Sequence, residues 1–390
     1  MDKLKPAIVV VAFNRPHSLR RLLRSVRQAD FSGYSDVPLV ISIDKGDNQE
    51  VLEVAASYVW EHGPKEVIAH DRRLGLRNHI VACGDLSLAY EAVIILEDDL
   101  FVSPAFYDFS VQALQYYRGR RGIGGISLYA YEFCEYADMM FTPLQDGYDN
   151  YFIQTASSLG QIWTREHWSG FKRWYEEHGN HPLQPVDPVP RSVRAWPESS
   201  WKKYFIKYVV DQNLYFVFPR VPLATDFGDE GTHTRGMGNL LQVPLLMRSK
   251  VFQWSSLEDS AAVYDAFFEP TQETVKRFCP EVRAYDFECD FYGTKELGQV
   301  KAEYLISSKQ TTARVRQFGD EMVPAVNNVI FGVPGTFFSL AKTRDYGALP
   351  KSKRLGMIYR QQRILSGATA LALGAYRLVV LLKSMVKRGS

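Results

Sequence analysis

The chain has 390 residues, of which 46% are hydrophobic and 23% charged, and its formal net charge is +2. This composition excludes a disordered or fibrous protein, and no internal repeat or low-complexity tract indicates a repeat architecture. The four cysteines show neither CxxC spacing nor a paired framework, which predicts a reduced intracellular protein without a zinc site or a disulfide scaffold: Cys83, Cys134, Cys279 and Cys289.

Charge is distributed unevenly along the chain. Residues 346–390 contain nine Lys and Arg residues and no Asp or Glu, so the whole-chain charge of +2 leaves −7 for the rest. An acidic body with a basic tail is typical of a protein that touches an anionic surface at one end. Nothing in this pattern indicates a nucleic-acid partner.

The first hundred residues alternate predicted strands and helices. The strands are Ala7 to Ala12, PLVISIDKGD (38–47), EVIAHD (66–71) and AVIILEDD (92–99), and the helices are NRPHSLRRLLRSVRQA (14–29), 50–62 and HIVACGDLSLAYE (79–91). The apolar run of the first strand is too short for a signal peptide. Alternation of this kind predicts an α/β fold with a parallel sheet covered on both faces.

Polar residues follow three of these strands. Asn14 and Arg15 follow the first, Asp44 ends the second, and Glu97, Asp98 and Asp99 end the fourth. Ligands of such sheets bind beyond the carboxyl ends of the strands. We therefore expect these side chains to lie at one edge of the sheet and to form a site.

The remainder of the chain predicts further elements around that sheet. A helix is expected at Ser103 to Arg118, strands at 122–130 and 213–220, and a helix at 199–212. Five prolines between residues 180 and 197 indicate a loop or lid, and TDFGDEGTHTRG (225–236) is a polar, glycine-rich loop. We predict three units: a domain at 1–250, an accessory α+β module at 251–345 whose chemistry the sequence does not indicate, and a tail at 346–390.

The tail ends in an apolar stretch. Ile364 to Leu382 is interrupted by Arg377 and bracketed by Arg363 and Lys383. Because this length and charge are marginal for a membrane span, an amphipathic helix lying in the plane of the interface fits better, with basic residues at lipid headgroups. The alternative is a buried or oligomerising helix.

The acidic triplet 97–99 has two interpretations. It is either a solvated turn or a site for Mg²⁺ or Mn²⁺ with a nucleotide diphosphate on the far side of the ion. Such ions typically use one or two protein carboxylates and leave the remaining positions to phosphate and water. No side-chain cation is evident at the strand end to balance the charge in place of a metal.

Four ordered motifs carry a family resemblance over about residues 5 to 240. VVVAFNRPHSLRRLLRSV, VISIDKGD, RRLGLRNHI and VIILEDDLFVSPAFYDF resemble the GT-A glycosyltransferases, which have a Rossmann-like, nucleotide-sugar-binding mixed sheet flanked by helices. The resemblance is to the inverting N-acetylglucosaminyltransferase I-like group and to bacterial family-2-like enzymes of surface polysaccharide synthesis. It implies a nucleotide-sugar donor and a divalent metal.

The resemblance also implies roles for single residues. Asn14, Arg15, Asp44, Arg73 and His79 would line the nucleotide pocket, Glu97 and Asp98 would meet ribose and sugar hydroxyls, and Asp99 would bind the metal, with His233 reaching the metal or the diphosphate. Each of these residues also has a purely structural interpretation. Asp44 could be a turn former, His79 a packed histidine on a helix face, and His233 an exposed loop residue.

Inverting transfer needs a base that takes the proton of the acceptor hydroxyl. The family places an acid in a W-D-D-W-like helix start, and the matching WPESSWKKYF (196–205) has Ser199 and Ser200 nearest those acids. Glu198 is the first candidate base, although it equally fits a first-turn helix acid, and Asp226 is the second. Trp163 and Trp168 would line the acceptor side on the family pattern but have the spacing of core residues.

The sequence therefore predicts a metal-dependent, inverting glycosyltransferase. Its acceptor would be lipid-linked or a polysaccharide, and it would lie in the cytoplasm, peripheral on the inner face of a bacterial cell membrane. One alternative is a catalytically silent scaffold or sugar-binding subunit of a polysaccharide assembly complex. Another is a sugar-phosphate nucleotidyltransferase, which is disfavoured because AFNRPHS after the first strand contains no glycine.

Overall fold

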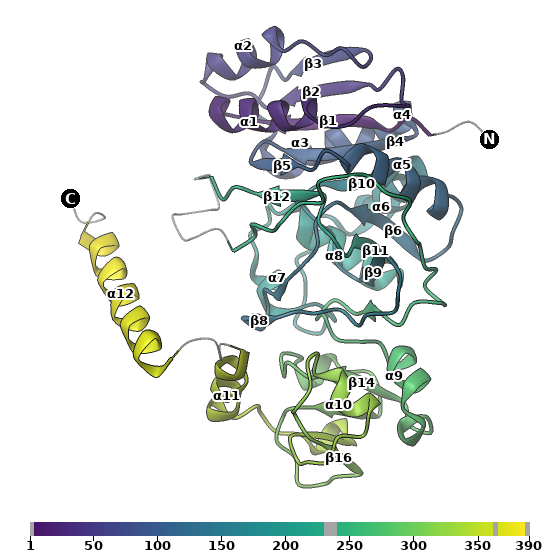
Figure 1. The fold of residues 1–390 in the computed structure, drawn as a ribbon, viewed down its shortest axis with the longest axis vertical. Coiled ribbons are helices and arrows are strands. Elements are labelled where there is room, and N and C mark those ends of the chain that lie inside the picture. Colours follow the sequence, from purple (N-terminus) through teal and green to yellow (C-terminus); the bar gives the residue numbers. More distant parts are fainter. Residues whose placement is uncertain (1–3, 230–239, 362–365, 387–390) are drawn as a thin grey trace.

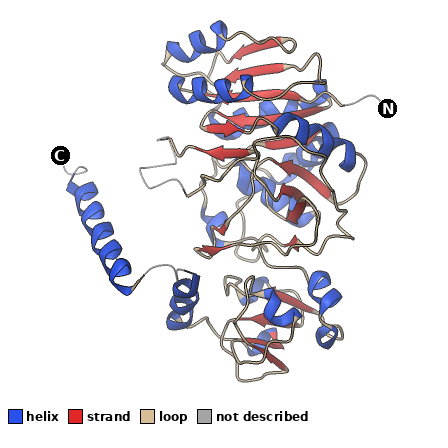
Figure 2. Cartoon of the chain, viewed as in Figure 1, coloured by secondary structure: helices blue, strands red, loops and turns tan. Residues whose placement is uncertain are grey.

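The computed structural model describes residues 4–229, 240–361 and 366–386. Within these residues the chain forms a large mixed sheet flanked by helices, a smaller four-stranded sheet and a C-terminal helix that lies apart from both (Figures 1 and 2). The α/β fold with a mixed sheet that the sequence predicts is present.

Nine strands within the described residues form the large sheet. In spatial order they are β13 (Val263–Tyr264), β9 (Asn150–Ile153), β11 (Tyr215–Pro219), β6 (Ile123–Ser127), β10 (Gln161–Thr164), β4 (Ala92–Glu97), β1 (Ala7–Ala12), β2 (Leu39–Ile43) and β3 (Lys65–Ala69). The strands predicted in the first hundred residues, β1 to β4, run parallel to one another. Beyond them, β10 runs antiparallel to both β4 and β6, and β9 antiparallel to β11.

The central strands are apolar because both faces of the sheet are covered. All six residues of β1, AIVVVA, are buried, as are the first five of β4, AVIIL. A strand with only one covered face would alternate apolar and polar residues. The continuous apolar runs therefore fix β1 and β4 as interior strands.

Helices connect and cover the strands. They are α1 (Pro16–Arg27), α2 (Gln49–Ser57), α3 (Gly75–Asp85), α4 (Ser87–Tyr90), α5 (Phe106–Tyr117), α6 (Arg165–His178), α7 (Arg191–Ala195) and α8 (Trp201–Asp211). Right-handed crossovers between parallel strands place α1 and α2 on one face and α3, which returns from β3 to β4, on the other. The contacts of α3 with α8, and of α8 with α6, build the second layer.

The strand order 3-2-1-4 contains a reversal between β1 and β4. The chain leaves β1 toward β2 but reaches β4 on the opposite side of β1, so the loops after β1 and β4 diverge. A crevice at the carboxyl ends of two such strands is the usual ligand site of open α/β sheets. The residues that follow Ala12 and Glu97 are therefore the candidates for a ligand site.

A second module follows the large sheet. Its four strands are β14 (Phe287–Asp290), β15 (Tyr304–Ser307), β17 (Phe338–Lys342) and β16 (Arg316–Phe318), accompanied by α9 (Gln272–Phe278) and α10 (Val326–Ile330). It has its own apolar core. The large sheet does not end at the expected residue 250, because β13 forms its edge and Phe252 to Phe268 contribute to its core.

A buried charge network joins the module to the large sheet. The Lys295 ammonium, 3% exposed, lies 2.6 Å from Asp265 and 2.8 Å from Glu288. Asp265 follows β13 and Glu288 lies in β14, so the network connects the edge of one sheet to the other. Burial, reinforced by Asp290 and Asp265, raises the pKa of the neighbouring Glu269 carboxyl well above its usual value.

The two C-terminal helices differ in their surroundings. In α11 (Lys351–Gln361) Met357 is buried, Arg354 pairs with Asp138 and Arg360 with Asp320, so this part of the predicted tail packs on the protein. In α12 (Gly367–Val386), which Figure 1 shows standing away from the other elements, Leu371 is 78% exposed. No helix within the described residues is long and apolar enough to cross a membrane.

The remaining elements are short. They are β5 (Leu100–Val102), β7 (Phe133–Cys134), β8 (Met139–Met140), β12 (Ala224–Asp226) and the 3₁₀ turns Pro280–Val282, Leu297–Gln299 and Thr343–Asp345. All four cysteines are free and buried, so no disulfide forms.

Candidate active site

The acidic triplet lies at the reversal between β1 and β4. Glu97 is the last residue of β4 and pairs in register with Val11 of β1. After the turn at 98–99, β5 runs antiparallel to β12, with Leu100 opposite Asp226. This pairing brings Asp226, 127 positions further along the chain from Asp99, beside the triplet.

Arg15 is the cation that the triplet requires. Its guanidinium donates to Asp98 and to Asp99, the latter over 2.9 Å. The expectation that no side-chain cation is present at the strand end is therefore wrong. The reason is local: Arg15 closely follows β1, whose carboxyl end is adjacent to that of β4.

One arginine does not balance the carboxylates. Burial, followed by the charges of Asp99 and Asp98, raises the pKa of Glu97 well above its usual value. Burial also raises the pKa of Asp98 to about 6, although Arg15 opposes the shift. Burial, with Asp99 among the contributing charges, raises the pKa of Asp226. Four carboxyl groups thus face one guanidinium, and additional positive charge would stabilise their ionised forms.

The loop after β12 is fastened to the site and to α1. The Phe227 amide donates to the Asp99 carbonyl over 3.1 Å, and the Gly228 amide to the Asp226 carboxylate over 2.8 Å. Asp229 accepts from Ser18 over 2.6 Å and pairs with Arg21. The predicted ligand His233 lies outside the described residues.

Asp44 accepts hydrogen bonds from three backbone amides. Its carboxylate accepts the amides of Lys45, Leu74 and Gly75 at 2.9, 2.7 and 2.9 Å. These bonds satisfy amides at the start of α3, which begins at Gly75, four residues before the predicted start. The side chain is 4% exposed.

The other predicted nucleotide contacts lie around the ends of β1 and β2. The Arg73 guanidinium lies 4.3 Å from the centre of the Phe13 ring. The Asn14 side-chain oxygen is buried and has no hydrogen-bond partner among the described residues. His79, by contrast, is buried in the core, where its ring nitrogen bonds Ser42 over 2.8 Å, and burial lowers its pKa to about 4.

Glu198 is held by α8. It pairs with the buried Lys203 ammonium over 2.7 Å and accepts from the Tyr204 hydroxyl. The Lys203 hydrogen bond is the largest cause that lowers the pKa of Glu198. A carboxylate with a lowered pKa and a bound cation is a poor proton acceptor. Asp226 is therefore the candidate base that the structure brings to the triplet.

The fit of a divalent cation depends on oxygen donors. Within the described residues no three His, Cys, Asp or Glu side chains are grouped as a complete metal-ligand set. Mg²⁺ and Mn²⁺ nevertheless bind with one or two carboxylates when phosphate and water complete the shell. Asp99, with 24% of its side chain exposed, supplies such a hard donor, and the surplus negative charge of the cluster, to which Asp226 contributes, suits a cation.

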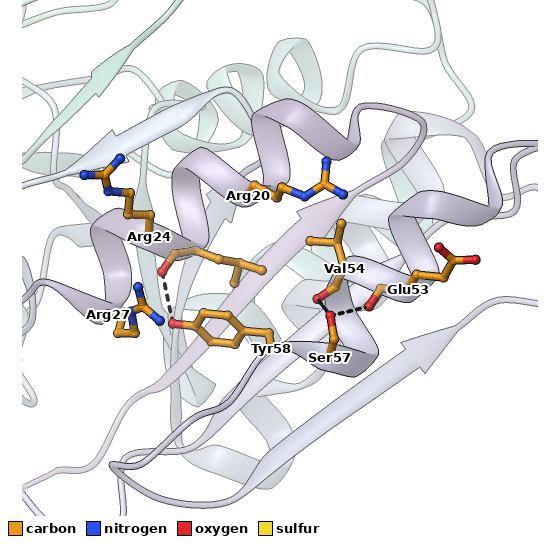
Figure 3. A pocket seen from close by; sticks show the side chains of 8 residues that line it. Arg20, Arg24, Arg27, Glu53, Val54, Ser57 and Tyr58 are labelled. Atoms are coloured by element: carbon orange, nitrogen blue, oxygen red, sulfur yellow. Dashed lines mark hydrogen bonds between the residues drawn. The ribbon is translucent and has the colours of Figure 1, made fainter.

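A separate groove lies between α1 and α2. It measures about 400 Å³ and is lined by arginines of α1, among them Arg24 and Arg27 (Figure 3). The Tyr58 hydroxyl donates to the Leu23 carbonyl over 3.0 Å, and the Ser57 hydroxyl donates to backbone carbonyls of α2. Because α1 runs back from the carboxyl edge of β1, its last turn lies away from the acidic triplet.

Comparisons with known proteins return structures only. No protein-family model and no curated protein matches the sequence. GalNAc-T7 with UDP, GalNAc and Mn²⁺ is 14% identical over 56% of this chain and 43% of that one, with a TM-score of 0.37. The mannosyltransferase PcManGT from Pyrobaculum calidifontis with GDP-Man and Mn²⁺ is 11% identical over 44% and 46%, with a TM-score of 0.31.

S. aureus TarS 1-349 in complex with UDP-GlcNAc is 12% identical over 58% of this chain and 60% of that one, with a TM-score of 0.36. This chain therefore spans less than two thirds of the length of each of these three structures. All three are glycosyltransferases.

Proposed function

We propose that this chain is a metal-dependent glycosyltransferase that moves a sugar from a nucleotide diphosphate sugar to an acceptor hydroxyl with inversion. The observation that carries the proposal is the acidic cluster of Glu97, Asp98, Asp99 and Asp226 at the β1–β4 reversal, where a single arginine leaves a deficit of positive charge. A nucleotide diphosphate with its cation supplies that charge in the crevice where such sheets bind ligands.

The chain's own residues have separable tasks in this reaction. Asp99 would hold Mn²⁺ or Mg²⁺, with His233 as a further candidate ligand, while Asp226 stays free for proton transfer. The ion would neutralise charge that develops on the departing diphosphate. Arg15, once displaced from a carboxylate, lies at the strand end and would donate to a phosphate oxygen.

Proton transfer needs a carboxylate near the acceptor oxygen. As the acceptor oxygen bonds to the anomeric carbon, the bond to the diphosphate breaks and the hydroxyl proton passes to a base. Asp226 suits that step because burial raises the pKa of its carboxyl group toward the range in which a base works at neutral pH. A single displacement requires no nucleophile from the enzyme.

The proposed acceptor is a lipid-linked sugar or a polysaccharide of a bacterial surface-glycan pathway. The support is the exposed apolar side of α12, where Leu371, Tyr376 and Leu378 are 78%, 67% and 62% exposed and no acidic residue occurs. Such a helix suits the interface of an anionic membrane, here the inner face of the cell membrane.

A second candidate function follows from Glu198. Because Lys203 and Tyr204 occupy this carboxylate, a catalytically silent sugar-binding or scaffold protein is also consistent with the site. The two functions differ in turnover: the scaffold binds a nucleotide sugar and leaves it intact.

The decisive experiment measures nucleotide release from a panel of nucleotide sugars in Mn²⁺, Mg²⁺ or EDTA. Wild type is compared with Asp99→Asn and with Asp36→Asn, a matched control at an exposed position where the backbone φ of 55° suits Asn. We expect metal-dependent release for one donor, reduced at least about 100-fold in Asp99→Asn, because an ion ligand acts mainly in the transition state. Calorimetric binding without release would favour the scaffold, and no binding of any donor would refute both.

A further inference from the structure

A cluster of polar side chains lies beyond the end of β6. We name it the tyrosine cluster and define it by six residues from three segments: Tyr129, Tyr131, Glu135, Tyr136, Thr155 and Lys202. The first four follow β6, Thr155 follows β9, and Lys202 lies in the first turn of α8.

The cluster is held together by direct contacts. The Lys202 ammonium lies 3.3 Å from the Tyr131 hydroxyl and 3.5 Å from the Glu135 carboxylate. The rings of Tyr129 and Tyr131 meet edge to face with centroids 5.2 Å apart. Neighbouring Glu135 and Tyr131 charges act on Tyr136, whose hydroxyl faces Thr155.

The protein does not use the full bonding capacity of these hydroxyls. Tyr129 and Thr155 are 0% exposed. The Tyr129 hydroxyl is buried without a hydrogen bond within the described residues, and the hydroxyls of Tyr136 and Thr155 face only each other. Buried polar groups in folded proteins are nearly always paired, so the Tyr129 hydroxyl indicates a partner that is not part of the chain.

The cluster adjoins Asp226. The Leu128 carbonyl, one residue before Tyr129, accepts the amides of Leu223 and Ala224 at 2.7 and 3.1 Å and so attaches this segment to β12. Burial first, then neighbouring groups that include Glu135 and Asp226, raises the pKa of Tyr129. A ligand in the tyrosine cluster would therefore lie beside the candidate base.

We propose that the tyrosine cluster is a subsite for the hydroxyl groups of a sugar ring. The inference rests on the proposed function and adds the residues that would recognise the sugar. Hydroxyls of Tyr129, Tyr136 and Thr155 donate and accept, the Glu135 carboxylate accepts, and aromatic ring faces pack against sugar C–H groups, which together match an uncharged polyhydroxyl ligand.

Both the sugar of the donor and the sugar of the acceptor have such hydroxyl groups and C–H faces, so the test must distinguish the two. The test uses full-length Tyr129→Phe and Thr155→Val, with Tyr359→Phe on the exposed face of α11 as the matched control. Tyr129→Phe removes a hydroxyl that has no protein partner within the described residues, and Thr155→Val one that faces only the Tyr136 hydroxyl, so the melting temperature is expected to change little. Tyr136→Phe replaces either variant that fails to fold.

Calorimetry with Mn²⁺ compares UDP and GDP with UDP-GlcNAc, UDP-galactose, UDP-glucose and GDP-mannose. If the subsite holds the donor's sugar, both variants lose at least about tenfold in affinity for the preferred nucleotide sugar and keep wild-type affinity for the bare nucleotide. Saturation-transfer NMR with millimolar N-acetylglucosamine, galactose and mannose, all uncharged, tests the acceptor. If the subsite holds the acceptor's sugar, nucleotide-sugar affinity is unchanged and the monosaccharide signal is lost in both variants.

Unchanged binding in both experiments would overturn the subsite and leave a water-filled structural cluster. Failure of the proposed function gives a different result, in which wild type binds neither nucleotide nor nucleotide sugar. The monosaccharide experiment then still decides whether the cluster binds sugar.

Discussion

Arg15 bonds the carboxylates that a divalent cation would use. Replacing it with Met removes the guanidinium from Asp98 and Asp99 and leaves the same carboxylates with one positive charge fewer. We expect Arg15→Met to bind Mn²⁺ about tenfold more tightly in the absence of nucleotide, which corresponds to about 1.4 kcal/mol.

Calorimetry or electron paramagnetic resonance with Mn²⁺ measures this affinity, and Arg20→Met, at an exposed arginine of α1 that pairs with Glu50, is the control. An unchanged or weaker Mn²⁺ affinity in Arg15→Met would show that Arg15 and the ion do not share these oxygens. Nucleotide-sugar affinity should fall in the same variant if Arg15 contacts the diphosphate.

His79 gives the molecule a predictable sensitivity to acid. Its pKa is about 4 in the folded protein, because of burial, and near 6.5 when unfolded, so the unfolded state binds more protons between these values. Stability contributed by neutral His79 is therefore complete above about pH 6.5 and is lost progressively as the pH falls toward 4, by about 3 kcal/mol in total. Urea unfolding from pH 7 to 4 should show a smaller loss in His79→Gln than in wild type, and equal slopes would contradict this assignment.

The position of the acidic triplet could be predicted more fully than the partners of the single residues around it. The placement of Glu97 to Asp99 and of Arg15 at strand ends follows from chain order and the parallel sheet, and both could be predicted. The tasks of Asp44, His79 and Glu198 depend on partners distant in space or hidden in the fold: the amides of Leu74 and Gly75, the hydroxyl of Ser42 and the ammonium of Lys203. The tyrosine cluster gave no sequence signal, because its members come from three segments joined only by folding.

At the scale of elements, the packing of α3 against α6 depends on a glycine, Gly84, at their contact. A Cβ at Gly84 of α3 would lie 2.3 Å from the indole of Trp168 in α6, which is fully buried. Gly84→Ala should destabilise the protein by about 1–3 kcal/mol through this overlap.

At Gly356 of α11 no atom lies within 4 Å of the position that an alanine methyl group would take, so Gly356→Ala should be neutral or stabilising by about 0.5–1 kcal/mol. Chemical unfolding of both variants tests the opposite signs, and equal effects would show that helix propensity alone decides.

The elements themselves were predictable where periodicity is strong. β1, β2, β4, α1 and α8 were expected within a few residues of their observed bounds. The beginning of α3 was not, because the carboxylate that accepts its first amides comes from Asp44, about thirty residues earlier. The two tryptophans Trp163 and Trp168 are buried and packed on each other with centroids 4.8 Å apart, as their spacing indicates for core residues.

At the scale of the whole molecule, the predicted tail divides into a packed part and an exposed part. The Tyr346 hydroxyl donates to carbonyls of the second module, and α11 pairs with Asp138 and Asp320, so residues 346–361 belong to the folded body. This division could not be predicted from the sequence because both parts of the tail are basic. What separates them is that the basic residues of α11 have acidic partners, Asp138 and Asp320, that only the folded structure reveals.

Truncation separates the two parts. Removing residues 362–390 should abolish sedimentation with phosphatidylglycerol vesicles and leave the melting temperature unchanged, because residues 366–379, the part of this segment whose burial the structure describes, are all exposed. Removing residues 346–390 should in addition lower the melting temperature. Vesicle binding that survives the shorter truncation, or that is insensitive to salt and to lipid charge, would contradict a membrane role for α12.

The Lys295 network limits where related genes could recombine and still encode a folded protein. An apolar junction tolerates a foreign partner of similar shape, whereas a buried ammonium requires carboxylates at matching positions on both sides, and losing one partner leaves an unpaired buried charge. Asp265 and Glu288 lie on different sheets, so recombination between them would separate a charge from its counter-charge. We therefore expect the two sheets to be exchanged between genes only as a single block, with crossovers tolerated after the network rather than within it.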